Sequence, residues 1–277
     1  MIALLQELFS YTFIVRAVVV GILVSLCSAL LGVNLVLKRY SMIGIGLSNV
    51  GFGALSLSMM LGFSTLQLSI PIVALASILL LRLSENSKIK GDAAIALISS
   101  VSLAVGIIAI TVKTGINTDV CNYMFGSILA MSKSEVYISI TSSVIIIVLY
   151  ILFYNKIFLV TFDENFARAV GINAELYNML ISILTSLIIV LGMRMMGAML
   201  ISSLIIFPAL TSMRVFNTFK SVVISSAVLS VFCFFVGIVA SFQLEYPTGA
   251  CIVMVNLAML LIFSVIGKII KQFNWRN

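Results

Sequence analysis

The charged residues in the segment Thr161–Gly171, TFDENFARAVG, are spaced for docking to another molecule rather than for catalysis. Thr161 is placed to cap the first turn of a helix, and Glu164, three residues later, is placed to reach back to it, as in a capping box. Gly171 offers a left-handed helix end. We therefore expect a short amphipathic helix over Thr161–Gly171.

The two faces of this expected helix differ in character. Glu164 and Arg168 lie four residues apart, a spacing that suits an ion pair, and Asp163 lies on the polar side with them. The apolar face has helical spacing and consists of Phe162, Phe166, Ala169 and Val170. Two interpretations remain open: a surface that docks on a protein partner, or an interfacial helix whose aromatic face lies among lipid headgroups.

Other chemistry is scarce in this chain. It contains no histidine, and Gly267-Lys268 is followed by Ile269, so no phosphate-binding loop of the GxxxxGK[ST] type is present. No acidic residue lies clearly within an apolar run, whereas proton-coupled carriers usually keep an ionisable residue there. We expect no catalytic residue, metal ligand or cofactor in this chain, and we expect ATP to be hydrolysed on another polypeptide. A secondary carrier or channel is the alternative mechanism.

The composition places these residues in a membrane. Of the 277 residues, 62% are hydrophobic and only 9% are charged, which is too little polar surface for a soluble domain. The net charge of +7 would suggest nucleic acid in a soluble protein, but here the basic residues flank apolar runs, where they set topology. We expect membrane lipid and no nucleic acid as a partner. The cysteines are scattered without metal-finger spacing and are Cys27, Cys121, Cys233 and Cys251.

The apolar runs predict an all-α, polytopic integral membrane protein with about eight or nine transmembrane helices in a single domain, residues 1–277. The nine candidate spans are Ala17–Leu37, Met42–Gly62, Leu66–Leu81, Ala93–Val112, Val136–Tyr154, Leu176–Met193, Met195–Met213, Ser221–Leu244 and Thr248–Gly267. The second and seventh spans are open to doubt as full crossings, because one is rich in glycine and the other contains Pro208.

These two spans also contain the candidate translocation path. In Ile43–Ala54, IGIGLSNVGFGA, small residues would allow close helix approach or leave a lumen. In Met195–Met213, Pro208 is expected to kink or break the helix, as in the broken helices beside transporter pathways, although a kinked packing helix is the alternative. The candidate path residues are Ile45, Ser48, Asn49, Ser202, Ser203 and Pro208.

The lysines and arginines are distributed asymmetrically in the nine-span arrangement. If the loop that contains Arg168 is cytoplasmic, only four of the sixteen basic residues lie outside: Arg16, Lys113, Lys133 and Arg194. This positive-inside bias predicts an external N-terminus, a cytoplasmic C-terminus and a cytoplasmic Thr161–Gly171 helix.

Five sequence blocks resemble the permease family of bacterial ABC uptake systems for zinc, manganese and iron. In chain order they are LGVNLVLKRYSMIGIGLSNVGFGAL (31–55), YMFGSILAMS (123–132), FDENFARAVGI (162–172), GAMLISSLIIFPAL (197–210) and YPTGACIVMV (246–255). The resemblance extends over nearly the whole chain and implies a multi-pass protein of the bacterial plasma membrane.

The same resemblance implies partners and roles. It implies two permease subunits that form a pathway, cytoplasmic ABC ATPase subunits, and an extracellular or periplasmic solute-binding protein. It also implies that Thr161–Gly171 is a coupling helix in a groove of the ATPase. The docking residues would be Phe162, Asp163, Glu164, Phe166, Ala167, Arg168 and Gly171.

The glycine-rich block departs from the family pattern. The family typically reads GDGLSH, whose Asp and His are thought to line the metal route, but Ile45 and Asn49 occupy those positions here. Isoleucine cannot coordinate a cation, and an amide is a weak ligand for zinc or manganese. Three hypotheses remain: a heterodimer whose second subunit supplies the ligands, a homodimer that passes a chelated metal or another small solute, and a non-transporting regulatory subunit.

Overall fold

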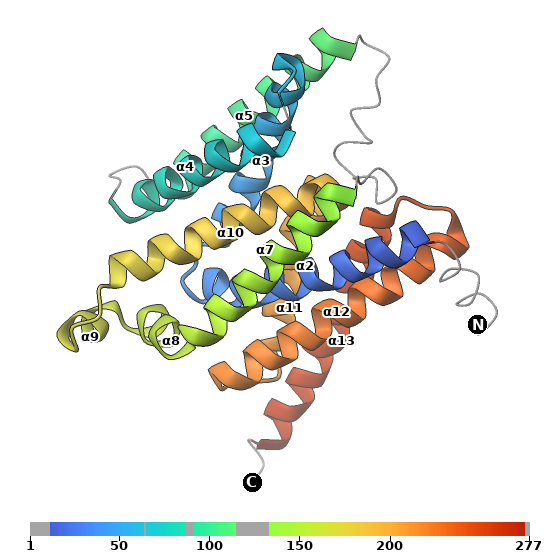
Figure 1. Cartoon of the computed structure of the whole chain (residues 1–277). Coiled ribbons are helices and arrows are strands. Elements are labelled where there is room, and N and C mark those ends of the chain that lie inside the picture. The colour runs from blue at the N-terminus through green and yellow to red at the C-terminus, as the bar shows by residue number, and fades with distance from the viewer. Residues whose placement is uncertain (1–11, 64, 87–90, 115–132, 275–277) are drawn as a thin grey trace.

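The chain folds as a bundle of helices (Figure 1). The structure is a computed structural model and describes residues 12–63, 65–86, 91–114 and 133–274. In chain order the helices are α2 (Thr12–Leu37), α3 (Ser41–Leu61), α4 (Thr65–Asn86), α5 (Gly91–Thr114), α7 (Lys133–Leu152), α8 (Tyr154–Phe162), α9 (Glu164–Ala169), α10 (Ala174–Met196), α11 (Ala198–Ser212), α12 (Phe219–Leu244) and α13 (Thr248–Asn274). The predicted all-α class is confirmed, whereas Cys121 and the block 123–132 lie outside the described residues.

Eight of the described helices are long and apolar enough to cross a membrane. The glycine-rich segment is one of them, since it forms the 21-residue helix α3. The segment predicted as the seventh span instead forms α11, which has 15 residues and is about 22 Å long, less than the roughly 30 Å of a hydrocarbon core. The expected eight or nine spans are thus eight helices of full length and one short helix.

Helices α2 and α10 form the centre of the bundle. Helix α2 packs against α7, α10, α11 and α12, and α10 packs against α2, α3, α4 and α11. Helices α3, α4 and α5 form a group on one side, at the top of Figure 1, and α11, α12 and α13 form a group on the other side. The apolar core extends through both groups, so the described helices form one body around a common core.

Glycines bring several helix pairs into backbone contact. A Cβ atom on Gly53 of α3 would lie 2.6 Å from the carbonyl oxygen of Ser102 on α5. A Cβ atom on Gly32 of α2 would lie only 1.9 Å from the carbonyl oxygen of Ile205 on α11. In α3, close helix approach is therefore what the glycines at positions 46, 51 and 53 provide, rather than a lumen.

The helix does not break at Pro208, and the chain is interrupted instead at Gly197, close to the boundary predicted between the sixth and seventh spans. Gly197 separates α10 from α11 with φ 84°, a conformation that glycine adopts readily, whereas α11 remains helical on both sides of Pro208. A proline has a φ compatible with a helix and removes only one backbone donor, so flanking packing can keep the helix intact. The predicted break at Pro208 is therefore wrong, because α11 continues through it.

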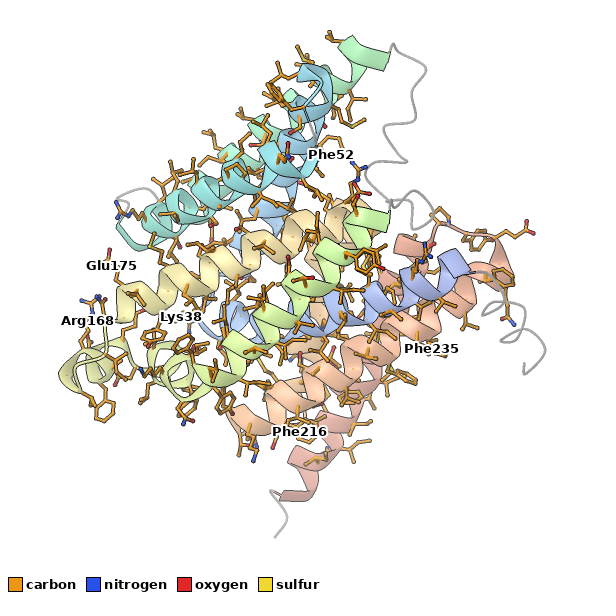
Figure 2. All side chains as sticks on the ribbon, in the orientation of Figure 1. Lys38, Phe52, Arg168, Glu175, Phe216 and Phe235 are labelled. Atoms are coloured by element: carbon orange, nitrogen blue, oxygen red, sulfur yellow. The ribbon has the colours of Figure 1, made fainter. Side chains whose placement is uncertain are left out.

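The two ends of the bundle are distinguished by their ion pairs. At one end, Arg194 of α10 lies 2.8 Å from Glu135 of α7. At the other end, Lys38 after α2 meets Glu164 of α9, and Arg168 and Glu175 lie at this end too (Figure 2). Helix α11 starts next to the end of α10, at the end of the bundle that carries Arg194. The chain after α11 reaches the opposite end, where the backbone of Arg214 packs on Gly267 near the end of α13. Helix α11 therefore returns the chain toward the end that carries α9.

Candidate functional site

Helix α9 begins at a sharp change of backbone direction. Asp163 is extended, with φ −147°, and ends α8 at Phe162. Its carboxylate Oδ1 accepts a hydrogen bond of 2.9 Å from the backbone N–H of Phe166, so Asp163 is the N-cap of α9. The predicted cap at Thr161 is wrong, because Thr161 lies within α8 and donates its hydroxyl to the carbonyl of Ile157. The expected single helix over Thr161–Gly171 is two helices that meet at Asp163.

The predicted end at Gly171 is confirmed. Gly171 has φ 84°, and its N–H donates to the carbonyl of Arg168. The N–H of Ile172 donates to the carbonyl of Ala167, which completes a Schellman motif. A glycine is needed here because the left-handed conformation disfavours a Cβ atom.

The apolar face predicted for this segment is exposed. The exposed fractions of Phe162, Phe166 and Val170 are 60%, 54% and 59%, and Ala169 is also exposed. Ala167 is fully buried and anchors α9 to the bundle. An open depression of about 390 Å³ lies between the end of α9 and the start of α10, and its lining residues are Arg168, Gly171, Ile172, Asn173 and Glu175. Aromatic side chains on a short, anchored helix are suited to insertion into a partner's groove.

The predicted ion pair between Glu164 and Arg168 is wrong. In the structure Glu164 Oε1 lies 2.6 Å from Lys38 Nζ and accepts a second hydrogen bond of 2.8 Å from Asn178 Nδ2. Partial burial alone would raise the pKa of Glu164, but the hydrogen bonds from Lys38 and Asn178 and the charges of Lys38 and Arg168 outweigh it. The pKa of Glu164 is therefore below its ordinary value, and the carboxylate is charged at neutral pH.

Helix α3 places the candidate path residues in different environments. Ile45 is 39% exposed, whereas Ser48 is buried and donates its hydroxyl to the carbonyl of Ile45. Asn49 is half-buried, and its Nδ2 donates a 2.6 Å hydrogen bond to Ser99 Oγ on α5. The outward face of α3 therefore contains Ile45 and, in part, Asn49.

On α11, the predicted hydroxyl residues bond back to their own helix. Ser202 and Ser203 are half-buried, and both donate to the carbonyl of Met199, while Pro208 is buried. A face of α11 that is not fully buried has helical spacing and consists of Met199, Ser202, Ser203, Ile206, Phe207 and Leu210. Sequence reasoning found only the serines of this face, although the i, i+3, i+4, i+7 spacing was present in the sequence.

Helices α3 and α11 pack side by side, so the candidate path residues lie on neighbouring elements. A Cβ atom on Gly44 of α3 would be in ordinary contact, at 3.5 Å, with the side chain of Ile205 on α11. Among the residues that the structure describes, no three Cys, Asp or Glu side chains gather into a group able to hold a metal ion.

Residues 10–267 match the model of the ABC 3 transport family. The chain belongs to this family. The resemblance seen in the five sequence blocks is therefore confirmed, and the chain is a multi-pass membrane component of an ABC transport system.

Relatives with metal-transport names are similar over almost their full lengths. The manganese import system permease protein ScaB of Streptococcus gordonii is 28% identical over 258 residues, which are 93% of this chain and 92% of that protein. A probable iron transport system membrane protein of Haemophilus influenzae is 30% identical over 265 residues, 95% and 93% of the two chains.

Two solved structures share the fold. PsaBC from Streptococcus pneumoniae in complex with Fab aligns with a TM-score of 0.85 and 29% identity, and the alignment covers 95% of each chain. An inward-facing putative metal-chelate type ABC transporter aligns with a TM-score of 0.75 but only 14% identity, with 93% of this chain and 87% of that chain covered. The second likeness concerns the fold alone.

Proposed function

We propose that this chain is the permease subunit of an ABC importer for a divalent metal ion, manganese, iron or zinc, or for its chelate. The observation that carries the proposal is the exposed Phe162–Phe166–Val170 face of an anchored helix at one end of a family-typical membrane bundle. The manganese and iron names of the relatives support the class of substrate. ATP hydrolysis belongs to a cytoplasmic ABC ATPase that receives α9, and a solute-binding protein delivers the substrate on the other side.

The proposed orientation places α9 in the cytoplasm of a bacterial cell, with the N-terminus outside and the C-terminus inside. The basic residues at the α9 end of the bundle support this orientation, since they include Lys38, Arg39, Lys156 and Arg168. The end marked by Arg194 and Glu135 would then face the solute-binding protein.

The proposed path follows the outward faces of α3 and α11, which meet the same faces of a second permease subunit. Ile45 provides no ligand, and the amide of Asn49 is already engaged by Ser99. We propose that the second subunit is a paralogue that supplies the Asp and His of the GDGLSH block. Mass spectrometry of the intact complex purified through this chain, with metal analysis of the same sample, tests this arrangement. We expect two different permeases, an ATPase and bound metal, whereas a homodimer without metal would favour a chelate or another small solute.

The Asn49→Ala substitution tests the path directly. We expect the initial rate of ATP-dependent metal uptake in proteoliposomes to fall about tenfold, because the variant removes the polar group from the outward face of α3. The control is Ser99→Ala, which removes the same Asn49–Ser99 hydrogen bond but leaves the amide in place. Equal losses in both variants would make Asn49 a packing residue. If even the wild-type complex showed no ATP-dependent uptake, the carrier, channel or regulatory alternatives would take precedence.

A further inference from the structure

Helix α9 has few attachments of its own to the membrane bundle. It contains six residues, of which only Ala167 is buried. The aromatic side chain of Phe166 points outward, and the two ends of α9 are formed by Asp163 and Gly171, both of which are exposed. Because Ala167 is the one side chain of α9 that packs in the interior, the polar contacts of α9 to other elements matter for how it moves.

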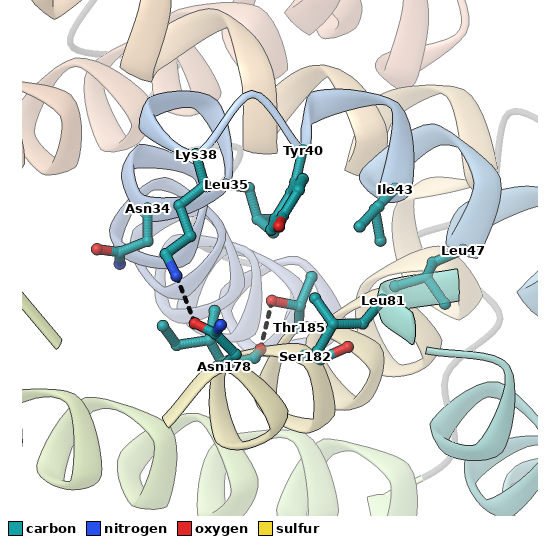
Figure 3. A pocket seen from close by; sticks show the side chains of 11 residues that line it. Asn34, Leu35, Lys38, Tyr40, Ile43, Leu47, Leu81, Asn178, Ser182 and Thr185 are labelled. Atoms are coloured by element: carbon teal, nitrogen blue, oxygen red, sulfur yellow. Dashed lines mark hydrogen bonds between the residues drawn. The ribbon is translucent and has the colours of Figure 1, made fainter. Parts of the chain in front are cut away.

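Three side chains join α9 to two membrane helices, and we call them the Lys38 clamp: Lys38, Glu164 and Asn178. Lys38 Nζ donates to Glu164 Oε1 at 2.6 Å and also to Asn178 Oδ1, while Asn178 Nδ2 donates to Glu164 Oε1 at 2.8 Å. The side chain of Lys38 is 9% exposed and Asn178 is 5% exposed. Figure 3 shows Lys38 extending from the end of α2 toward Asn178 on α10. Every pair within this triangle is hydrogen-bonded, which fixes α9, α2 and α10 relative to one another.

Lys38 belongs to a tight elbow between α2 and α3. Arg39 adopts a left-handed conformation with φ 62°, although it is not glycine. The N–H of Arg39 donates to the carbonyl of Val36, and the N–H of Tyr40 donates to the carbonyl of Leu35. These bonds form a Schellman motif, and α3 starts directly afterwards at Ser41. A displacement of Lys38 is therefore passed to the first turn of α3 without a flexible linker.

A second set of hydrogen bonds connects the same face of α2 to α7 and α8. Asn34, one helical turn before Lys38, donates to Tyr150 Oη at 3.1 Å, and its Oδ1 accepts a 3.2 Å bond from Thr161 Oγ1. Next to the clamp, the pocket in Figure 3 leaves space for about one water molecule between α2, α3 and α10. The elbow thus lies between the elements that lead to α9 and those that lead to α3.

We propose that Lys38 is the positioning residue that couples α9 to the translocation path. A movement that an ATPase imposes on α9 pulls on Glu164, is transferred through Lys38 to the α2–α3 elbow, and rotates or shifts the α3 face that contains Ile45 and Asn49. This inference rests on the proposed importer function. The side chain of Glu164 is 35% exposed, and a partly exposed ion pair adds little to stability, so a role in positioning accounts for these charges better than stability does.

The test compares variants in the purified complex reconstituted in liposomes, with metal uptake and ATP hydrolysis measured on the same sample. Lys38→Met keeps the length of the side chain and removes the charge. We expect normal assembly with the ATPase and continued hydrolysis, but about tenfold less metal taken up per ATP. The double variant Lys38→Glu/Glu164→Lys exchanges the two charges. We expect it to recover at least half of the uptake per ATP that Lys38→Met loses.

The control is Lys156→Met at the same end of the bundle. Lys156 Nζ lies 6.0 and 5.8 Å from the rings of Phe153 and Tyr177 and is not part of the clamp. This variant should keep the wild-type ratio of uptake to hydrolysis. A Lys38→Met complex whose uptake and hydrolysis are both unchanged, or fall in proportion, would overturn the coupling role. If the wild-type complex contained no ATPase or showed no ATP-dependent uptake, the proposed function itself would be contradicted.

Discussion

Phe166→Asp is expected to separate this chain from the proposed ATPase partner while leaving the membrane bundle intact. Phe166 is 54% exposed on α9, so the change costs the isolated permease little. In the complex the same position would place a charge in an apolar groove, which costs several kcal/mol, or at least remove an aromatic anchor worth about 2 kcal/mol. We expect ATPase affinity to fall roughly 30-fold or more.

Co-purification and direct binding measurements with purified ATPase would check this expectation. Phe63→Asp is the matched control, because Phe63 is 61% exposed but follows α3 at the other end of the bundle. Both variants should be produced in the membrane at wild-type levels, and only Phe166→Asp should lose the ATPase. Equal ATPase recovery with wild type and Phe166→Asp would show that α9 is not the docking element.

Gly32→Ala is expected to destabilise the bundle more than a methyl group added at any other described glycine. The added Cβ atom would lie 1.9 Å from the carbonyl oxygen of Ile205, a backbone atom that cannot rotate away. Helices α2 and α11 would have to separate at the centre of the core, which costs about 1–3 kcal/mol or more. We expect the apparent melting temperature in detergent to fall by roughly 5 °C or more, with a lower yield of monodisperse protein.

Gly44→Ala provides the control against the same residue of α11. Its Cβ atom would lie 3.5 Å from Ile205 Cγ2, an ordinary van der Waals contact, and a helical alanine is intrinsically favourable. Fluorescence-detected size-exclusion chromatography and thermal melting of the two variants should therefore differ clearly. If Gly32→Ala melted at the wild-type temperature, the close α2–α11 contact would not be a determinant of this fold.

Features that depend on nearby residues were predictable from the sequence. Hydropathy over about 20 residues identified the spanning helices, because the bilayer demands apolar surface from each helix separately. The left-handed end at Gly171 was also predictable, since only the local backbone decides it. The ordered sequence blocks were sufficient to indicate the family.

Features that depend on distant partners were not predictable in the same way. Glu164 has Arg168 four residues away, yet it pairs with Lys38, 126 residues earlier in the chain. A surface ion pair at i, i+4 contributes only about 0.3–0.5 kcal/mol. The partly buried pair with Lys38, together with the hydrogen bond from Asn178 to the same carboxylate, is therefore the more stable arrangement. Reversing the charges of Glu164 and Arg168 would therefore break the Lys38 clamp rather than preserve a local pair.

The sequence by itself determined that this is an all-helical membrane protein of the ABC 3 transport family with a short amphipathic segment between its spans. Only the tertiary structure decided where α9 begins, after Asp163 rather than Thr161, and that α11 stays helical through Pro208. The physical reason is that several residues in each segment can cap or bend a helix. The packing of distant elements selects which of them does so.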